Sequence, residues 1–304
     1  MNMVMNYLVL ILIVLVSVSF FTLFERKLLS YIQLRKGPNK VGIIGILQAF
    51  SDGMKLFSNE ISLLLKVNFF LYYFSPFFMF LISYSMWLLY PFLYGGISLM
   101  NYFLLLFCLL SMNVFPMMFA GVYSNSVYAI LGGLRSIAQT ISYEVSFIFL
   151  IFVYLFLGES LLIDMFMKVN FFVMIIMFPL SLMFFTSILA ELNRTPFDFS
   201  EGESELISGY NVEYMSGPFA LIFLSEYSNI IFLMMIFVKM NFLNLKFSMV
   251  LFFIFFLYLV ILIRALLPRL RYDKLMFMVW LNYLPIVMNY LIFMIFFKYI
   301  MFLI

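Results

Sequence analysis

Long stretches without a charged residue constrain this chain more than any other feature of its sequence. Neither acidic nor basic side chains occur from Val67 to Leu134, a run too long for one helix. The motif PFLYGGIS interrupts it, and Pro91, Gly95 and Gly96 in that motif predict a turn between two helices. A helix of about 20 apolar residues crosses a ~30 Å hydrocarbon layer. The chain is therefore predicted to be an all-α polytopic membrane protein.

Apolar runs of this length predict eight transmembrane helices in a single transmembrane domain, residues 1–304. The expected spans are 3–24, 69–90, 100–123, 137–157, 170–191, 218–238, 247–264 and 280–303. The first span has neither the basic leader nor the small-residue cleavage site of a secretory signal, so we expect it to be retained. The composition agrees, because 66% of the residues are hydrophobic and only 10% are charged.

The positive charges predict the orientation of these spans. Most of the 17 Lys and Arg residues lie in the connections after the odd-numbered spans. The opposite connections contain only Lys168, Lys239, Lys246 and Lys298. Because Lys and Arg favour the inner side of a membrane, we expect the odd-numbered connections inside and both termini outside.

The first connection is predicted to contain an amphipathic helix from Gly42 to Glu60. Its apolar residues recur at steps of three and four and comprise Ile43, Ile46, Leu47, Phe50, Met54 and Phe57. Such a helix is expected to lie in the membrane interface. The preceding motif, QLRKGPNKVG, places cations around Gly37 and Pro38, and the simplest role for its Lys residues is to anchor lipid headgroups.

Several kinds of cofactor site are excluded by composition. The chain has no His and one Cys, Cys108, so it lacks the usual ligands of haem, iron–sulfur clusters and structural zinc. We therefore expect no metal site and no covalently bound cofactor. Any electron carriers that serve this protein are expected on other chains.

Two acidic residues lie inside predicted spans. Glu144 is near the middle of the fourth, and Glu226 is the only charged residue between Glu213 and Lys239. A charge at the membrane centre costs about 2.5–3.5 kcal/mol on insertion scales, so such residues normally face a bundle interior or a wet cavity. We expect a proton relay or a ligand contact. A structural ion pair with Arg135 is the alternative for Glu144.

The segment AELNRTPFDFSEGESELISGYNVEY, residues 190–214, contains six of the 14 acidic residues. Local structure explains some of them, because Glu191 and Arg194 are spaced to pair and Ser200 with Glu203 matches a capping box. It does not explain all six. Crowded carboxylates titrate as a coupled set, so we expect this group to take up and release protons.

Four segments carry a resemblance to a known family. They are ERKLLSYIQLRKGPNKVGIIGILQAFSDGMKL (25–56), GGLRSIAQTISYE (132–144), the acidic segment 190–214 and RALLPRLRYDKLM (264–276). Together they closely resemble the subunit 1 family of mitochondrial NADH:ubiquinone oxidoreductase, respiratory complex I, and the likeness covers nearly the whole chain. Ser136 and Phe199 differ from the Ala and Leu expected there, which are mild changes away from the charges.

The resemblance implies an enzyme subunit in the mitochondrial inner membrane. It implies eight transmembrane helices in the membrane arm, beside a hydrophilic arm whose subunits bear flavin and iron–sulfur clusters. This chain would form much of the chamber through which the substrate ubiquinone enters. The implied partners are membrane-arm subunits, quinone-site hydrophilic subunits and membrane lipids, not nucleic acid. Its inner-face connections would lie on the matrix side and both termini on the intermembrane-space side.

The same resemblance assigns roles to individual residues. A proton path would use Glu144, Glu191 and Glu226, with Asp198, Glu201, Glu203 and Glu205 at its mouth. Quinone contacts would come from Arg26, Asp52, Phe223 and Arg264, with Arg35 and Arg194 shaping the entrance. The alternative function is a stand-alone proton-coupled membrane carrier. Carriers of that kind often contain inverted repeats, and the two halves of this chain show no convincing repeat.

Overall fold

The computed structural model describes residues 2–60, 67–90, 101–158, 177–199, 209–241 and 246–303. Within these ranges all regular structure is helical. The longer helices are α1 (Asn2–Ile32), α2 (Gln48–Ser58), α3 (Phe69–Met86), α4 (Tyr102–Tyr123), α5 (Val127–Gly158), α7 (Phe178–Glu191), α9 (Ser216–Asn241), α10 (Lys246–Leu266) and α12 (Leu284–Leu303). Shorter helical segments are η1 (Ile43–Gly45), η2 (Trp87–Leu89), η4 (Gly209–Asn211), α11 (Tyr272–Phe277) and η5 (Met278–Tyr283).

Seven helices in the described ranges are long and apolar enough to cross a membrane. They correspond to every predicted span except the fifth. The described part of that span is the 14-residue helix α7, which is shorter than a membrane crossing. The polytopic all-α class is thus confirmed, while the number eight stays a prediction because residues 159–176 lie outside the described ranges.

Three predicted spans are longer by at least eight residues in the structure than in the sequence analysis. α1 continues to Ile32, α5 starts at Val127, and the last crossing starts at Tyr272 as α11, η5 and α12 in succession. In each case the boundary had been placed where charge or small residues begin. Tertiary packing carries a helix through charged and small residues, as at Gly132 and Gly133 of α5.

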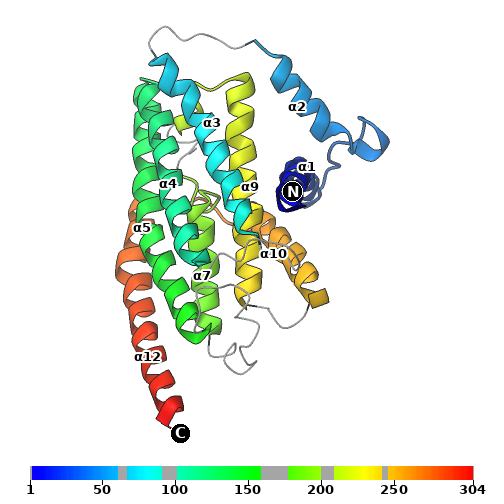
Figure 1. Cartoon of the computed structure of the whole chain (residues 1–304). Helices are drawn as coiled ribbons and strands as arrows, with labels where there is room; N and C mark the ends of the chain where they lie inside the picture. The colour runs from blue at the N-terminus through cyan, green and yellow to red at the C-terminus, as the bar shows by residue number, and fades with distance from the viewer. Residues whose placement is uncertain are drawn as a thin grey trace.

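Helices α3, α4, α5 and α9 form the centre of the bundle (Figure 1). α3 packs on α4 and α9, and α5 packs on α4, α7 and α12. Figure 1 shows α1 end-on while these helices run vertically, so α1 crosses the bundle steeply. It contacts α9 and α10, and Phe21 and Glu25 in its C-terminal half meet Tyr227 of α9.

α9 is the most buried of the candidate membrane spans, and aromatic rings pack around it. Phe232 of α9 meets Trp87 with ring centroids 5.5 Å apart, and Phe237 meets Phe184 of α7 at 5.6 Å. Such ring pairs add packing energy beyond their buried area. Although α9 is largely enclosed, its Glu226 is only partly buried.

Two glycines bring α5 unusually close to its neighbours. A Cβ on Gly133 would lie 3.2 Å from the Cα of Gly121 on α4. A Cβ on Gly132 would lie only 2.8 Å from the Cα of Gly209, which itself has a φ of 58°. Only Gly permits both the close contact and that left-handed backbone without strain. The pair therefore places η4, with Tyr210, directly against α5.

The predicted amphipathic helix of the first connection is confirmed as α2, but it starts at Gln48 instead of Gly42, because the chain makes a turn at η1. In that turn Gly45 has a φ of 79°, and a Cβ there would lie 2.2 Å from the carbonyl oxygen of Pro38. None of the α2 side chains is buried, and its apolar residues Phe50, Met54 and Phe57 are exposed. An exposed apolar side on a charged helix matches an interfacial position.

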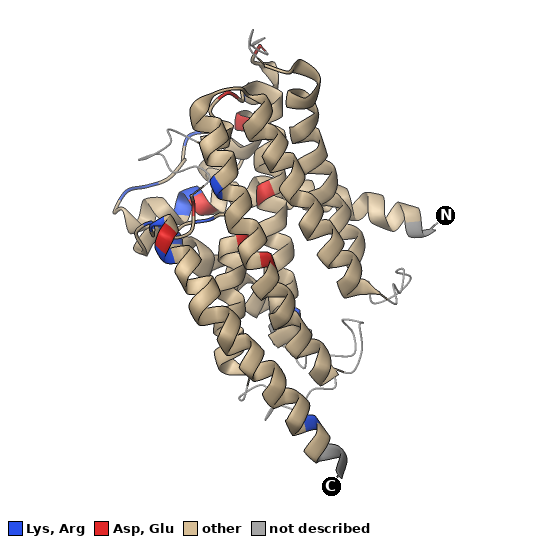
Figure 2. Ribbon diagram, turned by 90° about the vertical axis from the view of Figure 1, so that its left-hand side faces the viewer, with Lys and Arg blue, Asp and Glu red and all other residues tan. Residues whose placement is uncertain are grey.

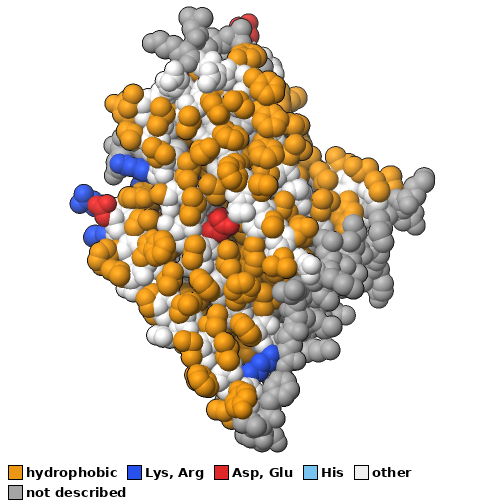
Figure 3. Space-filling view, turned by 60° about the vertical axis from the view of Figure 1, so that its left-hand side comes forward, with side chains coloured by type: hydrophobic (Ala, Val, Ile, Leu, Met, Phe, Trp, Pro, Cys, Tyr) orange, Lys and Arg blue, Asp and Glu red, His pale blue; other side chains and the backbone are white. Residues whose placement is uncertain are grey.

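Charged residues are few and unevenly placed. Figure 2 shows most of the Lys and Arg residues gathered on one side of the bundle, away from both chain ends, while several acidic residues lie within it. Figure 3 shows that one face of the molecule is almost entirely hydrophobic, with a single acidic patch near its centre. A surface of this kind is suited to lipid or to a hydrophobic partner, not to water.

Candidate functional site

The first part of the site is a buried ion pair between the first and seventh predicted spans. Glu25 of α1 is 5% exposed, and its carboxylate pairs with the guanidinium of Arg264 in the last turn of α10. Tyr227 of α9 donates a hydrogen bond to the other carboxylate oxygen at 2.7 Å. A buried carboxylate requires such compensation, because its desolvation is costly.

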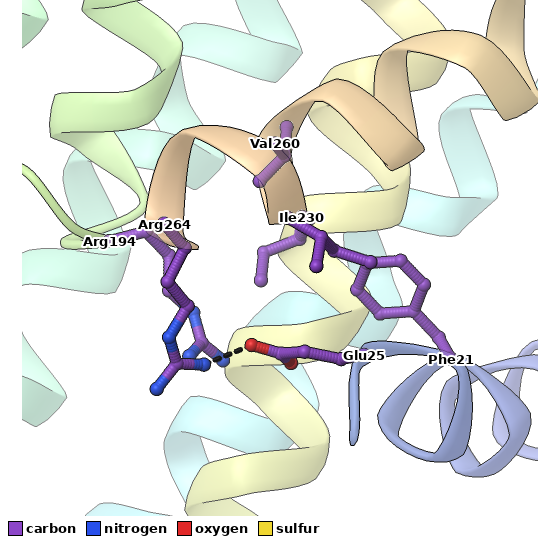
Figure 4. A pocket seen from close by; sticks show the side chains of 7 residues that line it. Phe21, Glu25, Arg194, Ile230, Val260 and Arg264 are labelled. Atoms are coloured by element: carbon purple, nitrogen blue, oxygen red, sulfur yellow. Dashed lines mark hydrogen bonds and ion pairs between the residues drawn. The ribbon is translucent and has the colours of Figure 1, made fainter. Parts of the chain in front are cut away.

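Arg194 completes this cluster from the turn after α7. Its guanidinium carbon lies 4.5 Å from the centre of the Tyr227 ring, a cation–π contact. Figure 4 shows Arg194 and Arg264 side by side with the Glu25 carboxylate pointing toward them. Glu25, Arg194, Tyr227 and Arg264 are called the arginine cluster below. It joins α1, α9, α10 and the α7 turn at one point.

A small cavity opens beside the arginine cluster. It is lined by Phe21, Glu25, Arg194, Ile230, Val260, Ile261 and Arg264. Its volume is about 10 Å³, close to the minimum that holds one water molecule. The cavity combines charged and apolar walls, and it is too small for an aromatic ring.

The second part of the site is Glu226, held by a tyrosine. Tyr210 of η4 is 2% exposed and donates a hydrogen bond to the Glu226 carboxylate. The close contact of Gly209 with Gly132 places Tyr210 where it can do so. Glu226 and Tyr227 are consecutive on α9, so the carboxylate that Tyr210 contacts is next to the tyrosine of the arginine cluster.

The third part comprises Glu144 and Glu191. Glu144 is half-buried in α5, and Glu191 is the last residue of α7. The two carboxylates interact electrostatically, and Glu191 Oε2 is buried with no hydrogen-bond partner among the described residues. Two mutually repelling acids in an apolar setting titrate as a coupled pair.

The turn that follows α7 is fixed from two sides. Gln139 of α5 donates hydrogen bonds of 2.8 Å to the carbonyl oxygens of both Ala190 and Phe197. On the other side, the amide of Leu270 donates to the carbonyl oxygen of Pro196 at 3.0 Å. Asp198, which is 9% exposed, lies 3.5 Å from the guanidinium of Arg269. Glu201, Glu203 and Glu205 lie outside the described residues.

The first connection has its own polar contacts. Arg26 forms an ion pair with Asp52 of α2, and Gln48 donates to the same carboxylate at 2.7 Å. The Arg26 side chain is 55% exposed, so this pair contributes little to stability. It does fix α2 against the end of α1. Arg35 contacts Gln33 at the surface and does not reach the arginine cluster.

The predicted quinone residues thus divide into two groups. Arg194 and Arg264 meet at Glu25, and Phe223 lies one turn from Tyr227 with ring centroids 6.4 Å apart. Arg26 and Asp52 form a separate pair on the interfacial side.

Two local pairings proposed from the sequence do not form in the structure. α7 ends at Glu191, so Arg194 lies beyond the helix and turns toward Tyr227. The expected Glu191–Arg194 ion pair was therefore wrong. The alternative pairing of Glu144 with Arg135 is likewise absent from the ion pairs of the described residues.

Sequence reasoning missed three residues of the site: Glu25, Tyr210 and Tyr227. Glu25 was placed just beyond the first span, although ERKLLSYI contains no helix breaker before Gly37 and so predicts that the helix continues. For the two tyrosines the sequence gives no comparable signal, because their hydrogen-bond partners depend on how distant helices pack.

Comparisons with known proteins identify the family of the chain. The sequence profile described as NADH dehydrogenase matches residues 5–295. The chain belongs to the NADH dehydrogenase family. The resemblance found in its motifs is therefore confirmed.

Curated members of the NADH dehydrogenase family are similar over nearly their whole length. NADH-ubiquinone oxidoreductase chain 1 of Locusta migratoria is 50% identical over 281 residues, covering 91% of this chain and 90% of the relative. The protein of the same name from Aedes aegypti is 49% identical over 281 residues, covering 90% and 88%. That of Tamias sibiricus is 41% identical over 287 residues, covering 91% and 90%.

Proposed function

We propose that this chain is a membrane-arm core subunit of a proton-translocating NADH:ubiquinone oxidoreductase in the mitochondrial inner membrane. Family membership supports this, as do the names of the relatives and the seven helices able to cross a membrane. Flavin and iron–sulfur clusters would be borne by partner subunits, since this chain has no His and one Cys. Its cation-rich connections would face the matrix, and both termini the intermembrane space.

In this proposal the arginine cluster and the exposed apolar side of α2 contribute to the ubiquinone chamber. A prenylated quinone needs an apolar access route and a few converging polar groups for its head. The apolar residues of α2 provide the first, and Arg194 and Arg264 provide the second. Because the cavity holds only about one water, quinone entry requires α1 and α10 to separate.

The carboxylates of α5, α7 and α9 are proposed to form the proton path. One observation carries this part: Glu226 and Tyr227 are consecutive on α9. Glu226 accepts a hydrogen bond from Tyr210, and Tyr227 donates one to Glu25 of the arginine cluster. A charge change near Glu25 acts on Tyr227, and any resulting shift of α9 also moves Glu226. Because reduction of a quinone consumes protons, such a shift links electron transfer to proton movement among Glu226, Glu191 and Glu144.

Replacing Glu144 or Glu226 by Gln tests this path. Each variant keeps the side-chain size but removes the exchangeable carboxyl proton. In inner-membrane vesicles we expect quinone reduction to continue at a reduced rate while proton pumping falls more steeply. Glu60→Gln, at an exposed position, is the matched control and should change neither. Normal pumping per quinone reduced in both Glu144→Gln and Glu226→Gln would end the proton-path proposal.

The alternative of a stand-alone carrier makes a different prediction about purification. A subunit should be recovered only within a large assembly that contains flavin and iron–sulfur clusters. A carrier should be recovered alone, with solute uptake that depends on a proton gradient. Gentle detergent extraction followed by size separation and cofactor spectroscopy distinguishes the two.

A further inference from the structure

Gln139 is an uncharged side chain that bridges both ends of the turn between the two proposed sites. It is completely buried on α5. Its amide nitrogen donates to the carbonyl oxygens of Ala190 and Phe197, each at 2.8 Å. These carbonyls immediately precede Glu191 and Asp198 in the chain, and Arg194 lies between them. On its α5 side, one side chain therefore links both ends of the turn that carries all three charged residues.

The orientation of this amide follows from its partners. Both are carbonyl oxygens, which only accept hydrogen bonds, so the NH₂ group must face them. The Gln139 carbonyl oxygen is left buried with no partner among the described residues. Glu191, adjacent to Ala190, likewise has a buried carboxylate oxygen without a partner in those residues. A buried acceptor of this kind normally receives a hydrogen bond from a water molecule or from a protonated group. The turn could therefore bind a water molecule or a proton at these two oxygens.

We propose that Gln139 is a positioning residue that couples the arginine cluster to the proton path. This rests on the function proposed above. If Arg194 moves when a quinone occupies the chamber, a turn held at Ala190 and Phe197 passes that movement to Glu191 as a rigid unit. Without the amide bridge, the turn can deform locally and absorb it. Gln139 need not touch quinone or exchange protons for this role.

The variants Gln139→Met and Thr140→Val, each within the assembled enzyme, test the proposal. Met has nearly the size of Gln and keeps the site filled, but it removes both bridging hydrogen bonds. Thr140 is the matched control because it is adjacent and 1% exposed, and its hydroxyl bonds only to carbonyls of its own helix, those of Ser136 and Ile137. Thr140→Val thus removes a buried polar group without releasing the turn.

Two measurements separate positioning from a general structural role. Amide hydrogen exchange reports the turn itself: the amides of Asn193, Arg194 and Phe197, all hydrogen-bonded within it, should exchange about tenfold faster in Gln139→Met. The number of protons pumped per quinone reduced reports coupling, and it should fall by about half or more at an unchanged amount of assembled enzyme. Thr140→Val should leave both values near wild type.

The possible failures are distinguishable. If exchange rises in Gln139→Met but the pumping ratio stays at the wild-type value, the turn does not transmit coupling and the Gln139 proposal is overturned. The same holds if both variants lose assembled enzyme in parallel with activity and the ratio is unchanged. If the number of protons pumped per quinone reduced falls in Glu144→Gln but stays normal in Gln139→Met, only the role of Gln139 is overturned. The proposed proton path would still stand.

Discussion

Substitutions in the arginine cluster should have a definite order of severity. Glu25→Gln leaves the guanidinium groups of Arg194 and Arg264 facing each other without the carboxylate between them (Figure 4). Arg264→Met instead leaves Glu25 with the Tyr227 hydroxyl and the charge of Arg194 nearby. Removing one partner of a buried pair costs about 3–5 kcal/mol. We assign the upper part of that range to Glu25→Gln.

Arg264→Met should cost less for two reasons. Its side chain is 37% exposed, so part of its charge is already solvated and screened. Glu25 also keeps its hydrogen bond from Tyr227, and a hydrogen bond to a charged group contributes about 1.5–3 kcal/mol. We therefore expect a cost of about 1–2 kcal/mol for Arg264→Met. The double variant should be more stable than Glu25→Gln alone, because it removes the repulsion between the arginines.

The assay is the temperature at which the assembled enzyme loses half of its quinone reductase activity in vesicles. We expect it to fall by about 5 °C or more in Glu25→Gln, by less in Arg264→Met, and to recover partly in the double variant. Equal losses in the two single variants, with simple additivity in the double variant, would show that the arginines do not act on one shared carboxylate.

Two further perturbations follow from the packing. Gly132→Ala puts a Cβ within 2.8 Å of the Gly209 backbone, so η4 must shift and Tyr210 with it. We expect the variant to lose about 1–3 kcal/mol of stability and to pump fewer protons. Gly53→Ala is the control, because no atom lies within 4 Å of its Cβ, and it should be neutral in the same assays. Met54→Asp puts a charge on the exposed apolar side of α2. The apparent KM for a long-tailed ubiquinone should then rise several-fold, while that for a short-tailed analogue changes little. An equal rise for both substrates would argue against α2 as a lipid-facing access route.

Hydropathy predicted the helices well because the membrane imposes one physical requirement on every span. A charge-free run such as Val67–Leu134 must form helices to satisfy its backbone hydrogen bonds, whatever lies around it. The amphipathic spacing in the first connection was equally informative, since it depends only on neighbouring residues. These features are local, and a single sequence contains them in full.

The site was less predictable because its contacts are long-range. Glu25 and Arg264 are 239 residues apart, and nothing in either segment identifies the other as its partner. The Glu191–Arg194 pairing failed for the opposite reason: local spacing favoured it, but the chain leaves the helix at Glu191 and Arg194 packs on Tyr227. The sequence placed Glu144 and Glu226 within spans but missed Glu25, and it did not indicate which side chains contact these acids.

The contact between Glu25 and Arg264 also sets an order on biosynthesis. α1 emerges from the ribosome first, whereas its counter-charge on α10 is made near the end, tens of seconds later at a synthesis rate of about 5–20 residues per second. Until then an acid on the first helix must stay near the bilayer surface, where a charge is tolerated. Because its ion pair forms only after α10 is made, α1 reaches its final position late in synthesis, after the helices between them.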